Sequence, residues 1–323
     1  MRDNPLVSVI MAAYNSEKYI AQSIESVLNQ TYGNFELIII NDDSSDRTPQ
    51  IVEEYGKRDS RVKLINSEEN LFVIKARNLG ISQAKGKYIA ILDSDDLALP
   101  ERFEKEVNCL ETRPDVFLVG GSTDFIDENN NFIREQIAPT DFEEIKRQIS
   151  GHNIIQHSSV MFRNDGIFYR EKMFYTEDYD LFLNLIAENK KIINLPEKLF
   201  KYRYLADSLS RRGTNFIYFL FKQKAQEFYR QKIRTGRDEY EDFNPQDFFQ
   251  MTDLEYISKE KDLYLGLKST WMFGDYKNFN LLMKKVKKQK IKGKDFLIFK
   301  MINLFGKSSF DFSFWLYLKR YKH

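Results

Sequence analysis

Two aspartates separated by one residue stand directly after an apolar run of the chain. The run covers residues 88–92, and the segment that follows it reads Asp93-Ser94-Asp95-Asp96. Carboxylates at positions i and i+2, where a buried strand emerges, form a hard oxygen site suited to Mg²⁺ or Mn²⁺. Such ions commonly hold a substrate diphosphate and are not fully caged by protein. The pattern therefore favours activated-phosphate chemistry, and its alternative is a turn or helix cap, since strand ends are rich in Asp for both reasons.

Polar side chains also follow two earlier apolar runs. Tyr14-Asn15 comes after residues 7–12, and Asn41-Asp42-Asp43 comes after residues 35–40. Amphipathic segments separate the runs, which is the pattern of β-α-β units around a mainly parallel sheet. In an open α/β sheet, ligands bind at the carboxyl ends of the strands. The sequence therefore predicts that three strand ends meet at one crevice.

The same patterns predict the elements that position these residues. In the first part of the chain we predict strands at residues 7–12, 35–40, 62–65 and 88–92, and helices that begin at Asn15 or Ser16, at Thr48-Pro49 and at Val73. Beyond Leu99 we predict a helix through Glu111, strands at 116–120, 158–162 and 199–204, a polar turn at 127–131, and a helix from Glu177-Asp178. Aromatic-rich helical segments follow at 215–232, 245–258 and 259–272. We place a domain boundary near Arg212, with a catalytic domain at 1–212 and a helical C-terminal region at 213–323.

Composition places the chain among globular proteins with a large core. It has 323 residues, of which 42% are hydrophobic, enough for one large domain and a smaller one. The single cysteine, Cys109, excludes an internal disulfide framework, so a reducing cytoplasmic compartment is the simplest expectation. No apolar segment reaches the roughly 18 residues of a spanning helix, so the sequence predicts a soluble or peripheral protein.

The C-terminal tail differs from the rest of the chain in charge. Residues 284–323 hold twelve Lys or Arg against two Asp, although the net charge of the whole chain is only +1. Lysines interleaved with aromatic residues such as Phe310 and Trp315 suit a helix in an anionic membrane interface. The alternatives are a solvated charge run beside a packing helix, or nucleic-acid contact. We favour the membrane surface and expect no nucleic-acid partner.

The ordered set of motifs between residues 5 and 205 resembles glycosyltransferase family 2. Its pieces are Val7-Ser8-Val9-Ile10 leading to Tyr14-Asn15, then residues 26–32, 35–44, 76–81 and 84–89, and finally the Asp93/Asp95 pair. Each piece alone is weak, but the set in this order is specific. The resemblance implies an α/β, nucleotide-sugar-binding A-type glycosyltransferase fold. It also implies sugar transfer from a nucleotide diphosphate donor, with inversion at the anomeric carbon.

The resemblance assigns roles at the strand ends. Ala12 and Tyr14 would hold the base by backbone contact and ring stacking, and Asp42 would accept a hydrogen bond from the uracil ring nitrogen. Taken singly, Tyr14 could be a core aromatic, Asp42 a turn residue and Arg77 the partner of a surface acid. The predicted nucleotide-sugar site consists of Ala12, Tyr14, Asn15, Asp42, Asp43, Arg77, Asn78, Asp93 and Ser94.

The acidic residues are expected to divide the chemistry between them. The departing diphosphate gains negative charge, and a divalent ion, Mn²⁺ or Mg²⁺, stabilises it. We predict Asp95 as the metal ligand with Asp93 assisting, and Asp96 as a cap of the helix near Pro100. By the resemblance, Asp178 is the base that takes the acceptor proton. Its alternative is a first-turn acid favoured by the helix dipole.

Three basic residues are weaker candidates for acceptor or diphosphate contact. His157 suits either a ligand contact or a hydrogen-bonded structural role. Many relatives carry a histidine where this chain has Leu205, so Arg211 or Arg212 is predicted to supply diphosphate charge instead.

These features predict a metal-dependent inverting glycosyltransferase of cell-surface polysaccharide biosynthesis. It would use a UDP-sugar donor and a saccharide or lipid-linked oligosaccharide acceptor, in the cytoplasm and peripherally at the inner face of the plasma membrane. One alternative is a sugar nucleotidylyltransferase, disfavoured because no Gly-rich phosphate loop follows the first strand. The other is a non-catalytic, membrane-associated binding subunit.

Overall fold

The computed structural model describes residues 4–205, 215–252, 263, 266–267, 270 and 276–288. The chain forms two compact units, one of residues 1–206 with 225–239 and the other of residues 207–224 with 240–323. The predicted boundary at residue 212 stays a prediction. Several predictions lie outside the described residues. They concern Arg211 and Arg212, the second part (253–258) of the helical segment predicted at 245–258, most of the segment predicted at 259–272, and the tail from residue 289 onward.

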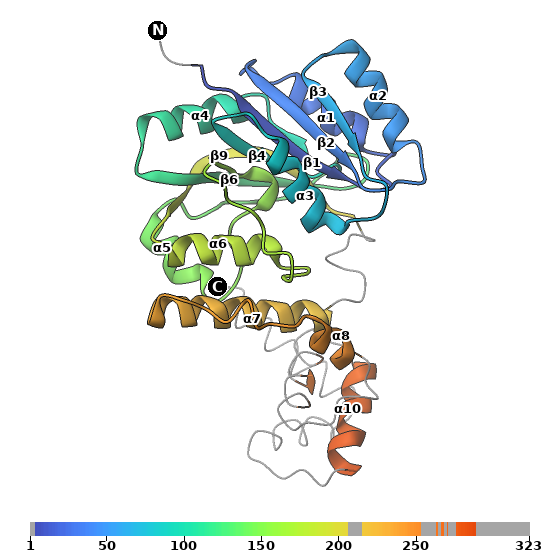
Figure 1. Ribbon diagram of the computed structural model, residues 1–323, viewed down its shortest axis with the longest axis vertical. Coiled ribbons are helices and arrows are strands. Elements are labelled where there is room, and N and C mark those ends of the chain that lie inside the picture. The colour runs from blue at the N-terminus through green and yellow to red at the C-terminus, as the bar shows by residue number, and fades with distance from the viewer. Residues whose placement is uncertain are drawn as a thin grey trace. The chain divides into compact units, whose positions relative to one another are not determined.

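A mixed sheet organises the first unit (Figure 1). The described residues form nine strands, which run β3-β2-β1-β4-β8-β6-β9-β5 across the sheet, and β7 pairs with β6. The strands are β1 (Val7–Ala13), β2 (Phe35–Asn41), β3 (Val62–Asn66), β4 (Tyr88–Ile91), β5 (Leu97–Ala98), β6 (Val116–Ile126), β7 (Phe132–Gln136), β8 (Met161–Arg163) and β9 (Lys191–Arg203). The helices of the first 205 residues are α1 (Ile20–Leu28), α2 (Thr48–Arg58), α3 (Phe72–Gln83), α4 (Arg102–Thr112), α5 (Phe142–Ile149) and α6 (Glu177–Ala187), with a 3₁₀ turn η1 (His157–Ser159).

The four predicted N-terminal strands are confirmed, each to within one residue at its end. β1, β2, β3 and β4 pair in parallel. Ala13 lies opposite Asn41, so β1 and β2 end together. Ile10 lies opposite Ile91, so β4 ends beside the middle of β1. Parallel pairing brings their carboxyl ends to one edge of the sheet, and the polar segments after β1, β2 and β4 begin at that edge.

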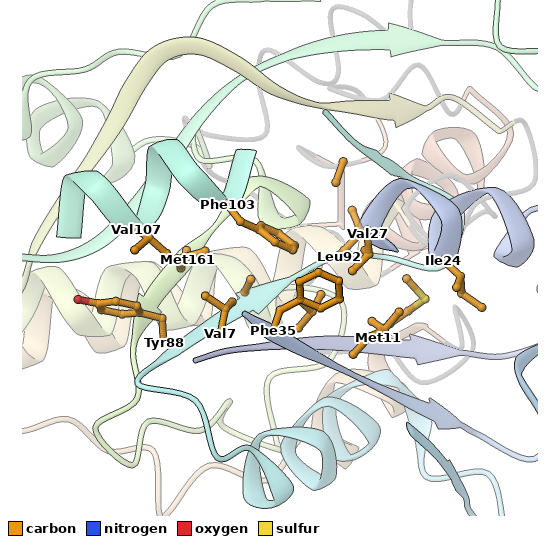
Figure 2. Close-up of a cluster of buried hydrophobic side chains, with 14 of the residues drawn as sticks. Val7, Met11, Ile24, Val27, Phe35, Tyr88, Leu92, Phe103, Val107 and Met161 are labelled. Carbon is orange, nitrogen blue, oxygen red and sulfur yellow. The ribbon is translucent and has the colours of Figure 1, made fainter. Parts of the chain in front are cut away.

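Helices cover both faces of these parallel strands. Alternate residues of β1 and β2 pack with α1, α2 and α4 in one core, where the rings of Phe35 and Phe103 meet edge to face (Figure 2). On the other face, α3 approaches so closely that a Cβ on Gly80 would lie 2.6 Å from the Ile10 side chain. Gly80 therefore fixes the depth at which α3, and with it Arg77, lies on the sheet.

Several predicted elements differ from the structure. Residues 158–162 were predicted as one strand, but residues 157–159 form η1 and only β8 follows, since the Ser159 hydroxyl bonds the Gln156 carbonyl. β6 and β9 extend well beyond the predicted residues, with register shifts near Gly121 that periodicity does not reveal. Asn15 and Ser16 do not cap α1. The Asn15 amide oxygen instead accepts from Ser45, which ties the loops after β1 and β2 together.

Helices dominate the described part of the chain after residue 214. They are α7 (Asn215–Thr235), α8 (Gln246–Thr252) and α10 (Tyr276–Lys288). α7 contributes residues to both units. In the second unit, the Phe221 ring packs against Phe243, Phe248 and Phe249. Among the described residues, no helix has both the length and the apolar character needed to span a bilayer.

Candidate functional site

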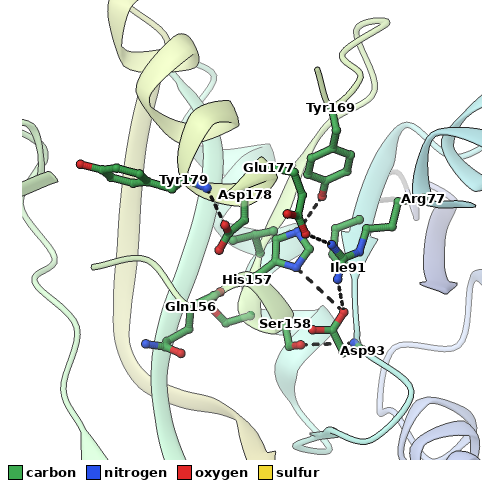
Figure 3. Close-up of polar contacts among 12 residues, drawn as sticks. Arg77, Ile91, Asp93, Gln156, His157, Ser158, Tyr169, Glu177, Asp178 and Tyr179 are labelled. Atoms are coloured by element: carbon green, nitrogen blue, oxygen red, sulfur yellow. Dashed lines mark hydrogen bonds and ion pairs between the residues drawn. The ribbon is translucent and has the colours of Figure 1, made fainter. Parts of the chain in front are cut away.

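A buried arginine joins the two acidic segments singled out in the sequence (Figure 3). Arg77 Nη2 donates to Asp93 Oδ1 at 2.6 Å, and Nη1 donates to Glu177 Oε1 at 2.6 Å. Arg77 reaches from α3, Asp93 follows β4, and Glu177 begins α6. Two consecutive segments, α3 and the loop after β4, therefore meet the distant start of α6 at one guanidinium, and Asp178 follows Glu177 in the chain.

Asp93 stays ionised because of this partner. Burial alone would raise the pKa of the Asp93 carboxyl, but the charge of Arg77 outweighs it and holds the pKa below its ordinary value. The Asp93 backbone N–H donates to Ser158 Oγ at 3.2 Å, which ties the loop after β4 to η1. The next residue, Ser94, shares a 2.8 Å hydroxyl contact with Ser16 from the loop after β1.

Asp178 occupies a setting suited to proton transfer. Its carboxylate is partly buried, with Oδ2 accepting from Asn153 Nδ2 at 2.8 Å and Oδ1 accepting from the Tyr179 N–H at 2.7 Å. Burial, and then the negative charge of Glu177, raises the pKa of Asp178 to about 7. A carboxyl with a pKa near neutrality can take a proton at that pH and release it again.

Asp95 lacks the pairing that Asp93 has. Its carboxylate makes no hydrogen bond or salt bridge to another side chain of the described residues, and burial, followed by the charge of Asp93, raises its pKa to about 6. In the same described part of the chain, no group of three or more His, Cys, Asp or Glu side chains is placed to hold a metal ion. Two neighbouring carboxylates without a protein cage fit Mg²⁺ or Mn²⁺, which take one or two carboxylates and complete their shell with substrate phosphates.

Asp96 has a structural role that differs from the predicted cap. It is 1% exposed, and its Oδ1 accepts the backbone N–H of Arg203 at 2.8 Å. Arg203 in turn donates from Nε to the Asp95 carbonyl at 2.8 Å. Helix α4 begins without a side-chain cap. The end of β9 therefore holds the acidic loop in place.

The ends of β1 and β2 form a second part of the predicted site. The Tyr14 side chain is 54% exposed, whereas Asp42 is buried and accepts the Leu71 N–H at 2.6 Å through Oδ1. The Asp42 N–H donates to the Ala13 carbonyl at 2.9 Å, so the two loops start in contact. Burial raises the pKa of Asp42. An exposed ring and a buried carboxyl on two adjoining loops suit a planar ligand with a polar edge.

The remaining strand-end residues take mixed positions. Ala12 is partly exposed on β1, and Asp43 is exposed with a left-handed φ of 59°. Asn15 has φ 48° and bonds across to the Ser44-Ser45 loop. Phe72, at the start of α3, is 65% exposed with φ 62°, which is unusual for an aromatic residue. Such backbone strain collects at ligand-binding loops.

Asn78 and His157 are both partly exposed and each hydrogen-bonds Tyr169, and their predicted ligand contacts stay predictions. The Asn78 side-chain amide donates to the Tyr169 carbonyl and accepts the Tyr169 N–H, both at 2.9 Å, where the sequence predicts a nucleotide contact. His157 Nε2 lies 2.7 Å from Tyr169 Oη, and Nδ1 lies 4.0 Å from Asp93 Oδ1. Burial, and then the charge of Arg77, lowers the pKa of His157 to about 3, so the ring is neutral.

Four further residues complete the site and were not singled out from the sequence. Ser158 and Tyr169 hold Asp93 and His157, Glu177 pairs with Arg77, and Asn153 pairs with Asp178. Glu177 was expected only as the start of a helix, and Ser158 only as the first residue of a strand. Asn153 and Tyr169 carry no sequence signal, because their partners lie across long loops.

Comparisons with known proteins match residues 8–175 to the family described as Glycosyl transferase family 2. An uncharacterized glycosyltransferase of Methanocaldococcus jannaschii is 38% identical over 233 residues, which is 70% of this chain and 78% of that one. The Escherichia coli UDP-Glc:alpha-D-GlcNAc-diphosphoundecaprenol beta-1,3-glucosyltransferase WfgD is 34% identical over 215 residues, 64% of this chain and 81% of that one.

Solved structures resemble the fold at low sequence identity. S. aureus TarS residues 1–349 in complex with UDP-GlcNAc has a TM-score of 0.54 and 18% identity, covering 87% of this chain and 85% of that one. A mannosyltransferase from Pyrobaculum calidifontis in complex with GDP-Man and Mn²⁺ has a TM-score of 0.54 and 14% identity, covering 95% and 81%. The mostly parallel α/β sheet is thus that of the A-type glycosyltransferases.

Proposed function

Because the chain belongs to glycosyltransferase family 2, we propose that this glycosyltransferase moves a sugar from a UDP-sugar to a saccharide or lipid-linked acceptor, with inversion. Family membership sets aside the nucleotidylyltransferase and the silent binding subunit. The name of the E. coli relative, with its UDP-Glc donor and diphosphoundecaprenol acceptor, supports the donor and acceptor classes. The name of another E. coli relative, the O-antigen biosynthesis glycosyltransferase WbnJ, supports a role in cell-surface polysaccharide biosynthesis.

The observation that carries this proposal is the double ion pair of Arg77. It brings the acidic loop after β4 and the first turn of α6 into one site, at 2.6 Å to each carboxylate. The first segment is suited to the donor diphosphate and the second to the acceptor hydroxyl. One site thus holds the groups that a direct displacement needs on both sides of the reacting carbon.

The transfer proceeds as a single displacement. Asp178 takes the proton of the acceptor hydroxyl while that oxygen bonds to the anomeric carbon from the face opposite the nucleotide. The bond between that carbon and the diphosphate oxygen breaks, and its electron pair leaves with the nucleotide. Arg77, ion-paired on both sides, keeps Asp93 charged beside the leaving group. A Mn²⁺ or Mg²⁺ ion, held by Asp95 with Asp93, would neutralise charge on the diphosphate.

Turnover should depend on the ionisation of Asp178. The protonated acid is no base, so kcat should rise as pH increases through the Asp178 pKa of about 7 and then level off. The Glu177→Gln variant removes the negative charge next to Asp178. It also leaves the positive charge of Arg77 neutralised by one carboxylate fewer. Both changes lower the pKa of Asp178, so the acid limb of its pH–kcat profile should move to lower pH. A profile measured at saturating donor tests this, and an unmoved limb in Glu177→Gln would contradict the base assignment.

Donor binding should require the divalent ion. We expect UDP-sugars to raise the melting temperature with Mn²⁺ or Mg²⁺ present, and EDTA to abolish both this shift and transfer. The Asp95→Asn variant should show the same loss at saturating metal. A panel of UDP- and GDP-sugars, each with and without Mn²⁺, identifies the donor. Stabilisation that EDTA leaves unchanged would remove the metal role of Asp95, and a panel without any stabilising nucleotide would contradict the proposed function.

A further inference from the structure

We infer that Asn153 and the second half of α7 position the Asp178 carboxylate for catalysis. The sequence predicts α7 as part of a separate helical region, and it predicts no role for Asn153 or Gln226. The inference rests on the proposed function, in which Asp178 takes the acceptor proton. It adds two positioning residues, of which Gln226 lies outside the residues 8–175 that match the family.

Asn153 is the direct partner of the base. Its side-chain Nδ2 donates to Asp178 Oδ2 at 2.8 Å, while its Oδ1 accepts the Ile155 N–H at 3.2 Å. The amide is therefore held at one end by its own loop and presents its donor to the carboxylate at the other. The Tyr179 N–H donates to the other carboxylate oxygen, Asp178 Oδ1. These two donors fix the plane of the carboxylate and favour its charged form.

Gln226 of α7 holds the loop that carries Asn153. Its Nε2 donates to the Gly151 carbonyl at 3.1 Å and contacts Tyr179 Oη at 3.1 Å. Tyr179 Oη donates to the Ile149 carbonyl at 2.6 Å. Gln226 and Tyr179 are both buried, so these bonds have little competition from water. The segment 149–151 is thus held from α6 and α7 together, two residues before Asn153.

The same stretch of α7 and the residues after it grip α6 at two more places. Lys232 Nζ donates to Asn184 Oδ1 and bonds Glu188 Oε1, both at 2.6 Å, near the end of α6. Arg170 forms a double ion pair, with Asp180 in the first turn of α6 and with Asp238 beyond α7. Residues 225–239 belong to the first compact unit for this reason. The helix that carries Asp178 is held along its length by this segment.

This arrangement predicts an effect on turnover that acts through Asn153. The charged groups that act on the pKa of Asp178 are Glu177 on α6, Arg77 on α3 and Asp93 after β4. The charge of Asp178 in turn raises the pKa of Tyr169. None of these changes when Asn153 is replaced. Loss of its hydrogen bond removes one stabiliser of the carboxylate and loosens its orientation, and small misplacements of a catalytic group lower rates strongly.

The test uses full-length variants Asn153→Ala, Gln226→Met and the double variant. We expect Asn153→Ala to lower kcat by about ten- to a hundredfold, leave the UDP dissociation constant unchanged, and move the acid limb of the pH–kcat profile to higher pH. Gln226→Met, which keeps the side-chain length, should lower kcat less. The double variant should match Asn153→Ala alone, because Gln226 acts through the same contact. Gln83→Met is the control, since Gln83 is exposed at the end of α3 and bonds its neighbour Ser82.

The outcomes separate this inference from the proposed function. Unchanged kcat and pH profile in Asn153→Ala would overturn it, as would kcat losses that multiply in the double variant. Melting temperatures and UDP affinity show whether Gln226→Met is folded. Should that variant unfold, Asn153→Ala alone still decides, because its side chain is only half-buried. Full transfer activity in Asp178→Asn would instead contradict the proposed function itself.

Discussion

Replacing Asp178 by Asn is expected to lower kcat by about 10²- to 10⁴-fold, the usual scale for loss of a general base. Asparagine has nearly the same volume and keeps an oxygen for the Tyr179 N–H or the Asn153 amide, so the fold should survive. Its amide cannot take a proton from the acceptor. The donor contacts that we propose lie with the loop after β4, so the UDP dissociation constant should stay unchanged. Initial transfer rates and a UDP titration on the same preparation measure both quantities.

The matched control for this variant is Asp165→Asn. The Asp165 side chain is 73% exposed and, among the residues that the structure describes, pairs only with Lys190, at 3.6 Å, so the same chemical change there should leave kcat unchanged. A loss in both variants would indicate a general effect of the substitution. Near wild-type turnover in Asp178→Asn would show that another group takes the proton.

The Arg77→Met variant is expected to lose about 3 to 5 kcal/mol of unfolding free energy, the cost of removing one partner from a buried ion pair. It would leave the Asp93 and Glu177 carboxylates facing each other without their shared counter-charge. The pKa of Asp93 lies below its ordinary value in the native protein, so its contribution to stability is present at neutral pH and disappears as pH falls through that lowered pKa. Urea unfolding at pH 7 and at acidic pH should show the difference between variant and wild type shrinking.

Arg58→Met supplies the control for that experiment. Arg58 pairs with Glu54 at 3.9 Å on an exposed face of α2, and exposed pairs contribute about 0 to 1 kcal/mol. If Arg77→Met were no less stable than Arg58→Met, the double ion pair would not be an organising contact of the site. Donor binding by Arg77→Met should also fall, because Asp93 loses the partner that keeps it charged.

The sequence predicts the part of the site that follows from local pattern. The strand of residues 88–92 is a continuous apolar run, those of residues 7–12 and 35–40 are apolar apart from Ser8 and Glu36, and parallel pairing alone brings their polar ends to one edge. The grouping of Tyr14, Asp42 and Asp93 at that edge is therefore foreseeable. The family resemblance adds the expected role of Asp178, which a first-turn acid at a helix start would not reveal by itself.

Contacts between distant segments are not readable in the same way. Arg77 and Glu177 are 100 residues apart, and nothing in the local pattern of either indicates the other. The bond of Asn78 to the Tyr169 backbone and that of Asp96 to Arg203 likewise depend on how long loops return to the sheet. The helix predicted at 215–232 is present, but its pairing with α6 depends on tertiary packing of Gln226 and Lys232.

The anomeric configuration of the first product tests the inverting transfer most directly. The donor is whichever α-linked UDP-sugar the nucleotide panel identifies, and the product is examined by proton NMR before any further reaction. A single displacement assisted by Asp178 predicts a β-linked product. An α-linked product would contradict the account, because it requires attack on the same face as the departing nucleotide, or two successive displacements.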